Sequence, residues 1–118
     1  MRLTEISYGS ALAIESYGPG FFRVGTHVLR GACLITPWDA GPWGGLVDTA
    51  APLALIGRID VLLLGMGADL SPVPREFRMA LEAAGIGVEP MNSPAACRTY
   101  NVLLGEGRRI AAALLPVG

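Results

Sequence analysis

The stretch "SPAACRTYNVLL", residues 93–104, holds the side chains best suited to nucleophilic chemistry. Cys97 lies one turn inside a predicted helix, where the positive helix end and the neighbouring Arg98 would lower its thiol pKa from about 8.5. A catalytic cysteine normally needs a base, and the only histidine, His27, lies in a distant predicted strand. Helical spacing puts Cys97 and Asn101 on one flank and turns Arg98 away from the core. A reactive thiol and a packing residue both stay open, and we favour packing because free cysteines are usually buried.

A second place for chemistry is the pair of loops that follow two predicted strands. Gly65-Met66-Gly67 ends one strand and Asn92-Ser93 ends the next. Ligands of open α/β sheets bind at such strand ends, and free N–H groups at a helix start hold anions. The alternative is a purely structural role, with a glycine turn beside a helix that is capped by Asn92 or Ser93. We favour this role because two glycines alone do not make a dinucleotide motif. The candidate binding residues are Gly65, Gly67, Asn92, Ser93, Cys97, Arg98 and Asn101.

Two tryptophans form the candidate interface. Trp38 and Trp43 lie in "PWDAGPWGG", which its proline and glycine content predicts to be a loop. Tryptophan is enriched at protein interfaces. The other interpretation, equally open, is that both rings fold back over the N-terminal hairpin sheet.

Composition excludes several function classes. The net charge is −1 and no five-residue run of one sign occurs, so we expect no nucleic-acid partner. All basic residues are arginine, which removes Schiff-base and P-loop lysine chemistry. Two cysteines and one histidine cannot supply a four-ligand zinc site, and the aspartates form no acid and base pair. We therefore expect no metal, no cofactor and, on balance, no enzyme.

The N-terminus does not resemble a signal peptide, and the longest apolar runs are shorter than the roughly 20 residues that span a bilayer. We therefore expect a cytoplasmic protein that does not span the membrane.

These residues must be positioned by a predicted α/β domain. A two-residue turn at Gly25-Thr26 predicts a β-hairpin, and "ACLITP" predicts a third strand that Pro37 ends. A helix is predicted from Thr49 to Ile56, capped by Asp48 or Thr49 with Pro52 in its first turn. The remaining predicted elements are strand 59–65, helix 74–84 with Gly85 as its C-cap, strand 86–91, helix 93–107 and strand 109–117. This strand-helix-strand-helix-strand alternation predicts a single three-layer domain over residues 1–118 with right-handed crossovers.

Several stretches resemble a known family. "DVLLLGMG", "PREFRMALEAAGIGVEPMNSPAACRTYNVLLGEGRRIAAALL" and the upstream "SYGPGFFRVGTHVLRGACLITP" are similar to the family that contains the mitochondrial respiratory complex I assembly factor 3 and the adipogenesis-associated domain proteins. The resemblance implies a mixed central sheet, allows an antiparallel last strand, and carries no established catalytic residues. The matching block positions are Gly65, Gly67, Asn92, Ser93, Cys97, Arg98, Thr99, Tyr100 and Asn101.

The resemblance also implies a function. It points to a non-enzymatic protein that helps to assemble a respiratory complex, peripheral to the inner membrane, with complex subunits or assembly proteins as partners. A homodimer through the hairpin or the Trp38–Trp43 loop is compatible with it. The alternative is a small-molecule or anion-binding domain, conceivably an enzyme, that uses the crevice at Gly65-Gly67 and Asn92-Ser93.

Overall fold

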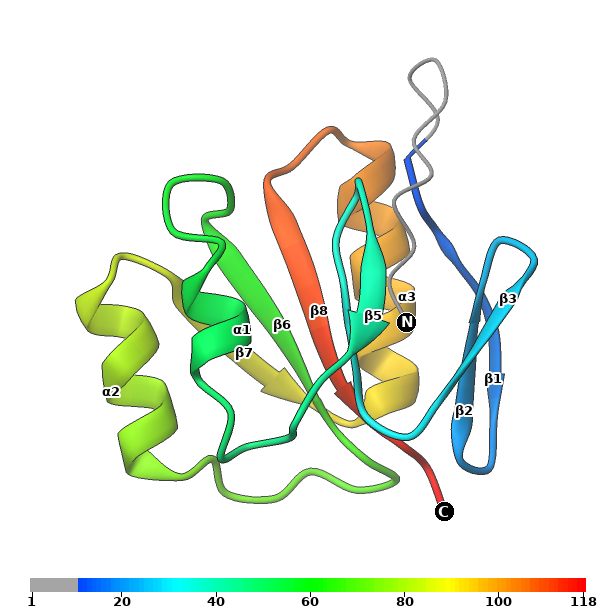
Figure 1. Ribbon diagram of the computed structural model, residues 1–118, viewed down its shortest axis with the longest axis horizontal. Coiled ribbons are helices and arrows are strands. Elements are labelled where there is room, and N and C mark those ends of the chain that lie inside the picture. Colours follow the sequence, from blue (N-terminus) through cyan, green and yellow to red (C-terminus); the bar gives the residue numbers. More distant parts are fainter. Residues whose placement is uncertain (1–10) are drawn as a thin grey trace.

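The computed structural model describes residues 11–118, and a five-stranded mixed sheet forms its centre (Figure 1). The strand order is β5-β4-β8-β6-β7. In the middle, β6 (Val61–Met66) runs parallel to both β7 (Gly87–Met91) and β8 (Ile110–Leu115). Beyond β8, β4 (Cys33–Ile35) runs antiparallel both to β8 and to the edge strand β5 (Ala40–Pro42). The mixed sheet implied by the resemblance is therefore confirmed.

The two inner strands are buried on both faces, as their uninterrupted apolar runs predict. Leu63 of β6 faces one core cluster, whereas Leu62 and Leu64 face the other. In β8, Ala112 and Ala113 alternate in the same way. Since all of these side chains are buried, the sheet must be covered on both sides.

Two short helices cover one face of the sheet. They are α1 (Ala50–Leu53) and α2 (Arg75–Ala83), seen on the near side in Figure 1. Phe77 and Leu81 of α2 pack against β6 and β8 in one core cluster, and Gly85 follows α2 with φ +86°. This helix and its glycine C-cap are confirmed as predicted.

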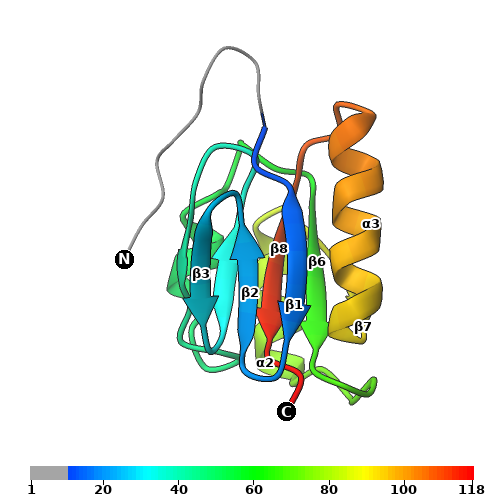
Figure 2. The ribbon, with the colours of Figure 1, turned by 90° about the vertical axis from the view of Figure 1, so that its right-hand side faces the viewer.

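The other face is covered by α3 (Ser93–Gly105) and a separate three-stranded antiparallel sheet. That sheet has the order β1-β2-β3, with β1 at Ile14–Gly18, β2 at Phe21–Val24 and β3 at His27–Arg30. Figure 2 shows it beside α3, and residues of both share one core cluster. The result is the predicted three-layer α/β architecture.

The N-terminal elements differ in part from the prediction. The hairpin is confirmed, because Val24 pairs with His27 across the two-residue turn. A further strand, β1, extends it to three strands. The predicted third strand is β4, which joins the other sheet, and β5 lies inside the segment predicted to be a loop. Its three residues "AGP" carry no strand pattern, and Pro42 is tolerated since β5 is an edge strand.

Helix α1 is shorter than predicted. The helix covers Ala50–Leu53, and tighter bonds such as Ile56 N–H to Leu53 O continue the chain beyond it. Of the two predicted caps, Asp48 performs the role: its Oδ1 accepts a hydrogen bond from Ala51 N at 3.1 Å, whereas Thr49 makes no side-chain cap bond.

The direction of the last strand, β8, differs from the antiparallel one that the resemblance allows. β8 is parallel to β6, with Val61 opposite Ile110, and it is antiparallel only to β4. The crossover rule applied to the strand-helix-strand alternation therefore gives the right direction for β8. Within this sheet β4 alone runs opposite to the other four strands, since it pairs antiparallel with both β5 and β8.

Side chains of α3 attach it to the start of β1. Asn101 accepts a hydrogen bond from Ile14 N at 2.9 Å and donates one to Ile14 O at 2.8 Å, so its amide pairs with the backbone as a neighbouring strand would. Next to it, the Tyr100 hydroxyl donates to Leu12 O at 2.7 Å. These three bonds join the two elements of the third layer.

We predict that Asn101→Ala lowers the free energy of unfolding by about 1–3 kcal/mol, because it leaves the Ile14 N–H and C=O of a buried residue without partners. The control Val102→Ala, at an exposed neighbouring position, should change it by less than about 0.5 kcal/mol. Urea unfolding measures both variants. Amide exchange at Ile14 should also accelerate in Asn101→Ala alone, and equal stability of the two variants would contradict the attachment.

Candidate functional site

The two loops of the predicted crevice do lie together, and Ser93 joins them. Since β6 and β7 are neighbouring parallel strands, their ends share one sheet edge, as predicted. Gly67 N donates to Ser93 Oγ at 2.9 Å, and Ser93 N donates to Gly67 O at 2.7 Å. The Ser93 hydroxyl donates in turn to Leu115 O at 2.6 Å. One buried serine thus links the ends of β6 and β8 to the start of α3.

The backbone donors expected for an anion are already used. Ala95 N donates to Asn92 Oδ1 at 2.8 Å, and Ala96 N donates to Asn92 O at 3.0 Å. Ser93 N binds Gly67 O, and Pro94 has no N–H. The prediction of free N–H groups at this helix start is therefore wrong, because the cap and Ser93 satisfy the whole first turn. The capping role of Asn92 is confirmed.

The two glycines serve packing and turning. A Cβ atom on Gly65 would lie 2.7 Å from Ser93 Oγ and 2.8 Å from Leu114 Cδ2. Gly67 has φ +94°, a conformation that other residues rarely adopt. Gly65 thus lets α3 approach β6 closely, and Gly67 allows the chain to turn after β6.

Burial sets the chemistry of Cys97. Its side chain lies in the core cluster between α3 and the sheet, and desolvation raises its pKa to about 11, although Arg98 opposes this shift. The lowered pKa predicted from the helix end and Arg98 is therefore wrong. Burial also raises the pKa of Cys33, to about 12, and the neighbouring Cys97 adds to this shift. Neither thiol is a ready nucleophile at neutral pH.

The seven candidate binding residues do not converge. Four of them, Gly65, Gly67, Asn92 and Ser93, meet at the end of β6. By contrast, Cys97 lies in the core, Asn101 binds β1, and Arg98 is exposed to solvent.

The two tryptophans have different environments. Trp43 is only 5 % exposed: its Nε1 donates to Asp48 O at 2.9 Å and its ring packs edge-on against Phe77, with 6.0 Å between centroids. It folds onto the α2 side and not over the hairpin sheet, and its burial removes it from a surface interface. Trp38 is half-buried, and the Arg58 guanidinium carbon lies 4.0 Å from its ring centroid.

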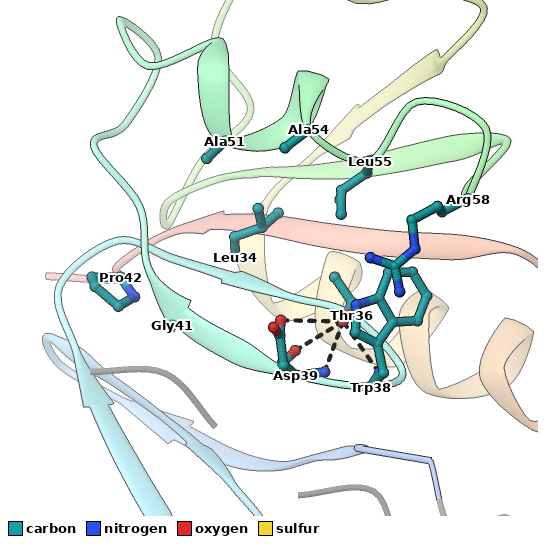
Figure 3. Close-up of a pocket in the computed structure, with 10 residues that line it drawn as sticks. All are labelled: Leu34, Thr36, Trp38, Asp39, Gly41, Pro42, Ala51, Ala54, Leu55 and Arg58. Atoms are coloured by element: carbon teal, nitrogen blue, oxygen red, sulfur yellow. Dashed lines mark hydrogen bonds between the residues drawn. The ribbon is translucent and has the colours of Figure 1, made fainter. Parts of the chain in front are cut away.

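Trp38 and Arg58 line a hollow of about 500 Å³ beside the β4–β5 turn (Figure 3). Its other walls include Leu34, Thr36 and Asp39 from β4 and the turn, with Ala51, Ala54 and Leu55 from the α1 segment. Sequence reasoning named Trp38 here but missed Arg58, because no local pattern pairs residues in two loops twenty positions apart.

Two further features bear on site chemistry. Within residues 11–118, no group of three or more His, Cys, Asp or Glu residues is placed to hold a metal ion. In that same part of the chain, no helix is long and apolar enough to cross a membrane.

We predict that Gly65→Ala destabilises the protein by about 1–3 kcal/mol, because the new methyl group meets Ser93 and Leu114 inside a packed core. The matched control is Gly105→Ala at the end of α3, where a Cβ meets nothing within 4 Å. That change should leave the free energy of unfolding unchanged or raise it by up to about 1 kcal/mol. Denaturant unfolding of both variants tests the contrast, and a neutral Gly65→Ala would refute the close approach.

We also predict that neither thiol reacts with a thiol reagent near pH 8 at the rate of free cysteine, whereas both react after denaturation. Above about pH 9.0 the unfolded chain loses thiol protons that the folded chain retains, so stability should fall as pH rises. This fall should be smaller in Cys97→Ala. Rapid native labelling of Cys97 would restore the nucleophile hypothesis.

Comparison with known sequences identifies relatives along nearly the whole chain. An uncharacterised protein of Rhodobacter capsulatus is 51% identical over 117 residues, which are 99% of this chain and 94% of that protein. The zebrafish (Danio rerio) protein named NADH dehydrogenase (ubiquinone) 1 alpha subcomplex assembly factor 3 is 34% identical over 95% of this chain and 67% of its own length. Its human counterpart is 30% identical over 98% of this chain and 67% of its own length.

Solved structures share the fold. The crystal structure of a protein described as an outer membrane protein from Bartonella henselae superposes with a TM-score of 0.83 at 35% identity, covering 92% of this chain and 98% of that one. The solution structure of a Bordetella pertussis protein with an Mth938-like domain has a TM-score of 0.77 at 27% identity, and the match covers 100% of this chain and 94% of that one. The family described as "protein of unknown function (DUF498/DUF598)" matches residues 14–115. The resemblance seen in the sequence is therefore confirmed, and the chain belongs to the DUF498/DUF598 family.

Proposed function

We propose that this protein helps to assemble a respiratory complex through protein contacts, without catalysing a reaction. The observation that carries the proposal is its identity of 34% and 30% to proteins named as complex I assembly factors, over nearly the whole chain. The proposed partners are subunits or assembly proteins of the complex, and the proposed location is the cytoplasmic side of the inner membrane.

The α1/α2 side offers side chains for such contacts. Val47, Leu70 and Met79 are 93 %, 63 % and 53 % exposed. Met79 lies on α2, Leu70 lies in the loop before α2, and Val47 lies in the loop between β5 and α1, where it shares a hollow with residues of α2. A hollow lined by Val47, Pro74 and Phe77 lies on one flank of α2, and one lined by Leu70, Val73 and Pro90 lies on the other. Exposed apolar side chains grouped around hollows are typical of protein interaction sites. We call Val47, Leu70 and Met79 the α2 surface.

The crevice alternative has less support. Its proposed anion would need donors at the start of α3, and these N–H groups bind Asn92 and Gly67 instead. The anion-binding alternative at that edge of the sheet therefore has less support than the contact proposal.

Affinity capture of the tagged protein from its own cells, with membranes solubilised, tests the proposal. We expect respiratory-complex subunits or assembly proteins to be recovered with the native protein. The double variant Val47→Arg, Leu70→Arg should reduce their recovery at least about tenfold, since charges at a contact disfavour it by more than about 1.4 kcal/mol. Both positions are exposed, so the fold should be retained.

The control is Val102→Arg, at an apolar position on α3 that is 59 % exposed. It should leave recovery unchanged. Capture of the native protein without any respiratory-complex component would refute the assembly role. If the double variant and the control lost the captured proteins equally, the α2 surface would be refuted as the contact.

A further inference from the structure

The hollow beside the β4–β5 turn exists because the helical layer is incomplete. Helix α1 has only four residues, and Leu34 of β4 is left half-buried on the face that α1 and α2 cover elsewhere. The resulting hollow of about 500 Å³ lies within the range of about 300–1,000 Å³ typical of small-molecule sites. Its size alone therefore permits a ligand.

The apolar lining comes from two directions, as Figure 3 shows. Leu34 contributes from the sheet and Leu55 from the segment after α1. Ala51 and Ala54 also line the hollow, and their small side chains leave the space open. Such a lining favours a compact apolar body.

Arg58 supplies a positive charge at this hollow. Its guanidinium stacks on the Trp38 ring with 4.0 Å between its carbon and the ring centroid, which leaves its in-plane N–H donors directed outward. It forms no ion pair with any of residues 11–118, whereas Arg78 and Arg109 are paired with Glu82 and Asp60. A stacked guanidinium with free donors suits a carboxylate, which it can bind with two parallel hydrogen bonds.

The wall of the hollow that carries Trp38 is a turn fixed by hydrogen bonds. Thr36 Oγ1 accepts hydrogen bonds from Asp39 N at 2.8 Å and Trp38 N at 3.2 Å, and it donates to Asp39 O at 3.0 Å. This turn holds Trp38 in place. The Asp39 side chain, 9 % exposed, also lines the hollow.

We propose that this hollow binds a small organic acid with a compact apolar body. The carboxylate pairs with Arg58, and the body packs against Leu34, Leu55 and the Trp38 ring. This binding site is separate from the α2 surface and independent of the assembly role.

The test uses 2-naphthoate as the probe and its neutral analogue 2-naphthalenemethanol, titrated into the full-length protein by calorimetry and by ¹H–¹⁵N spectra. We expect 2-naphthoate to bind and to shift amides in residues 34–42 and 51–58. The alcohol, and the variant Arg58→Gln with naphthoate, should each bind at least about tenfold more weakly, as the loss of a charge-assisted pair implies.

Two further variants keep the test specific. Arg109→Gln removes an exposed arginine that is paired with Asp60, and it should not change the affinity. Ala54→Phe places a large ring at an exposed position of the lining and should abolish binding while Arg58 remains. Absence of naphthoate binding, shifts confined to other residues, or equal affinity in Arg58→Gln would each overturn the proposal.

Discussion

The fold depends on one buried hydroxyl group, that of Ser93. It accepts a hydrogen bond from Gly67 N and donates one to Leu115 O, while the serine N–H binds Gly67 O. The ends of two parallel strands and the start of the helix that crosses them are therefore fixed at a single point. Because the group is fully buried, water cannot replace any of these bonds, and each would leave an unsatisfied backbone atom if lost. The absence of a side chain at Gly65 follows from the same constraint, since α3 must approach β6 closely for Ser93 to reach both strands.

The polar residues of α3 continue this pattern along the helix. Asn101 pairs with both backbone groups of Ile14, and Tyr100 binds Leu12 O. A side-chain amide thus performs the role of a strand next to β1, and the three-stranded sheet is attached to the helix without a continuous backbone ladder. A stretch that combines cysteine, arginine, tyrosine and asparagine suggests a reactive site, but here its buried polar groups are used to join layers.

Local patterns predicted most of the elements, and long-range contacts account for the errors. The apolar run of β6 and the periodicity of α2 identify these elements, because each pattern is repeated over a whole element. The three residues of β5 carry no such pattern, and only pairing with β4 makes them a strand.

For the candidate site, the adjacency of Gly67 and Ser93 can be predicted because the two strands before them are parallel neighbours, but the hydrogen bonds between these two residues cannot. The thiol pKa of Cys97 was misjudged for a related reason: charge proximity can be read from sequence, whereas the larger effect of burial depends on packing from distant segments.

The two faces of the central sheet therefore differ in what remains for function. On the α3 side, the polar side chains of the family block other than the exposed Arg98 are mostly bound internally, so changes at the bound groups act first on stability and on the amount of folded protein. On the α1/α2 side, the helices are short, several large apolar side chains are exposed, and Arg58 has a ring contact but no ion pair with residues 11–118. A change that alters function while leaving stability intact should accordingly map to this second side. Under the proposed function, the partners would contact residues other than those that best mark the family by sequence.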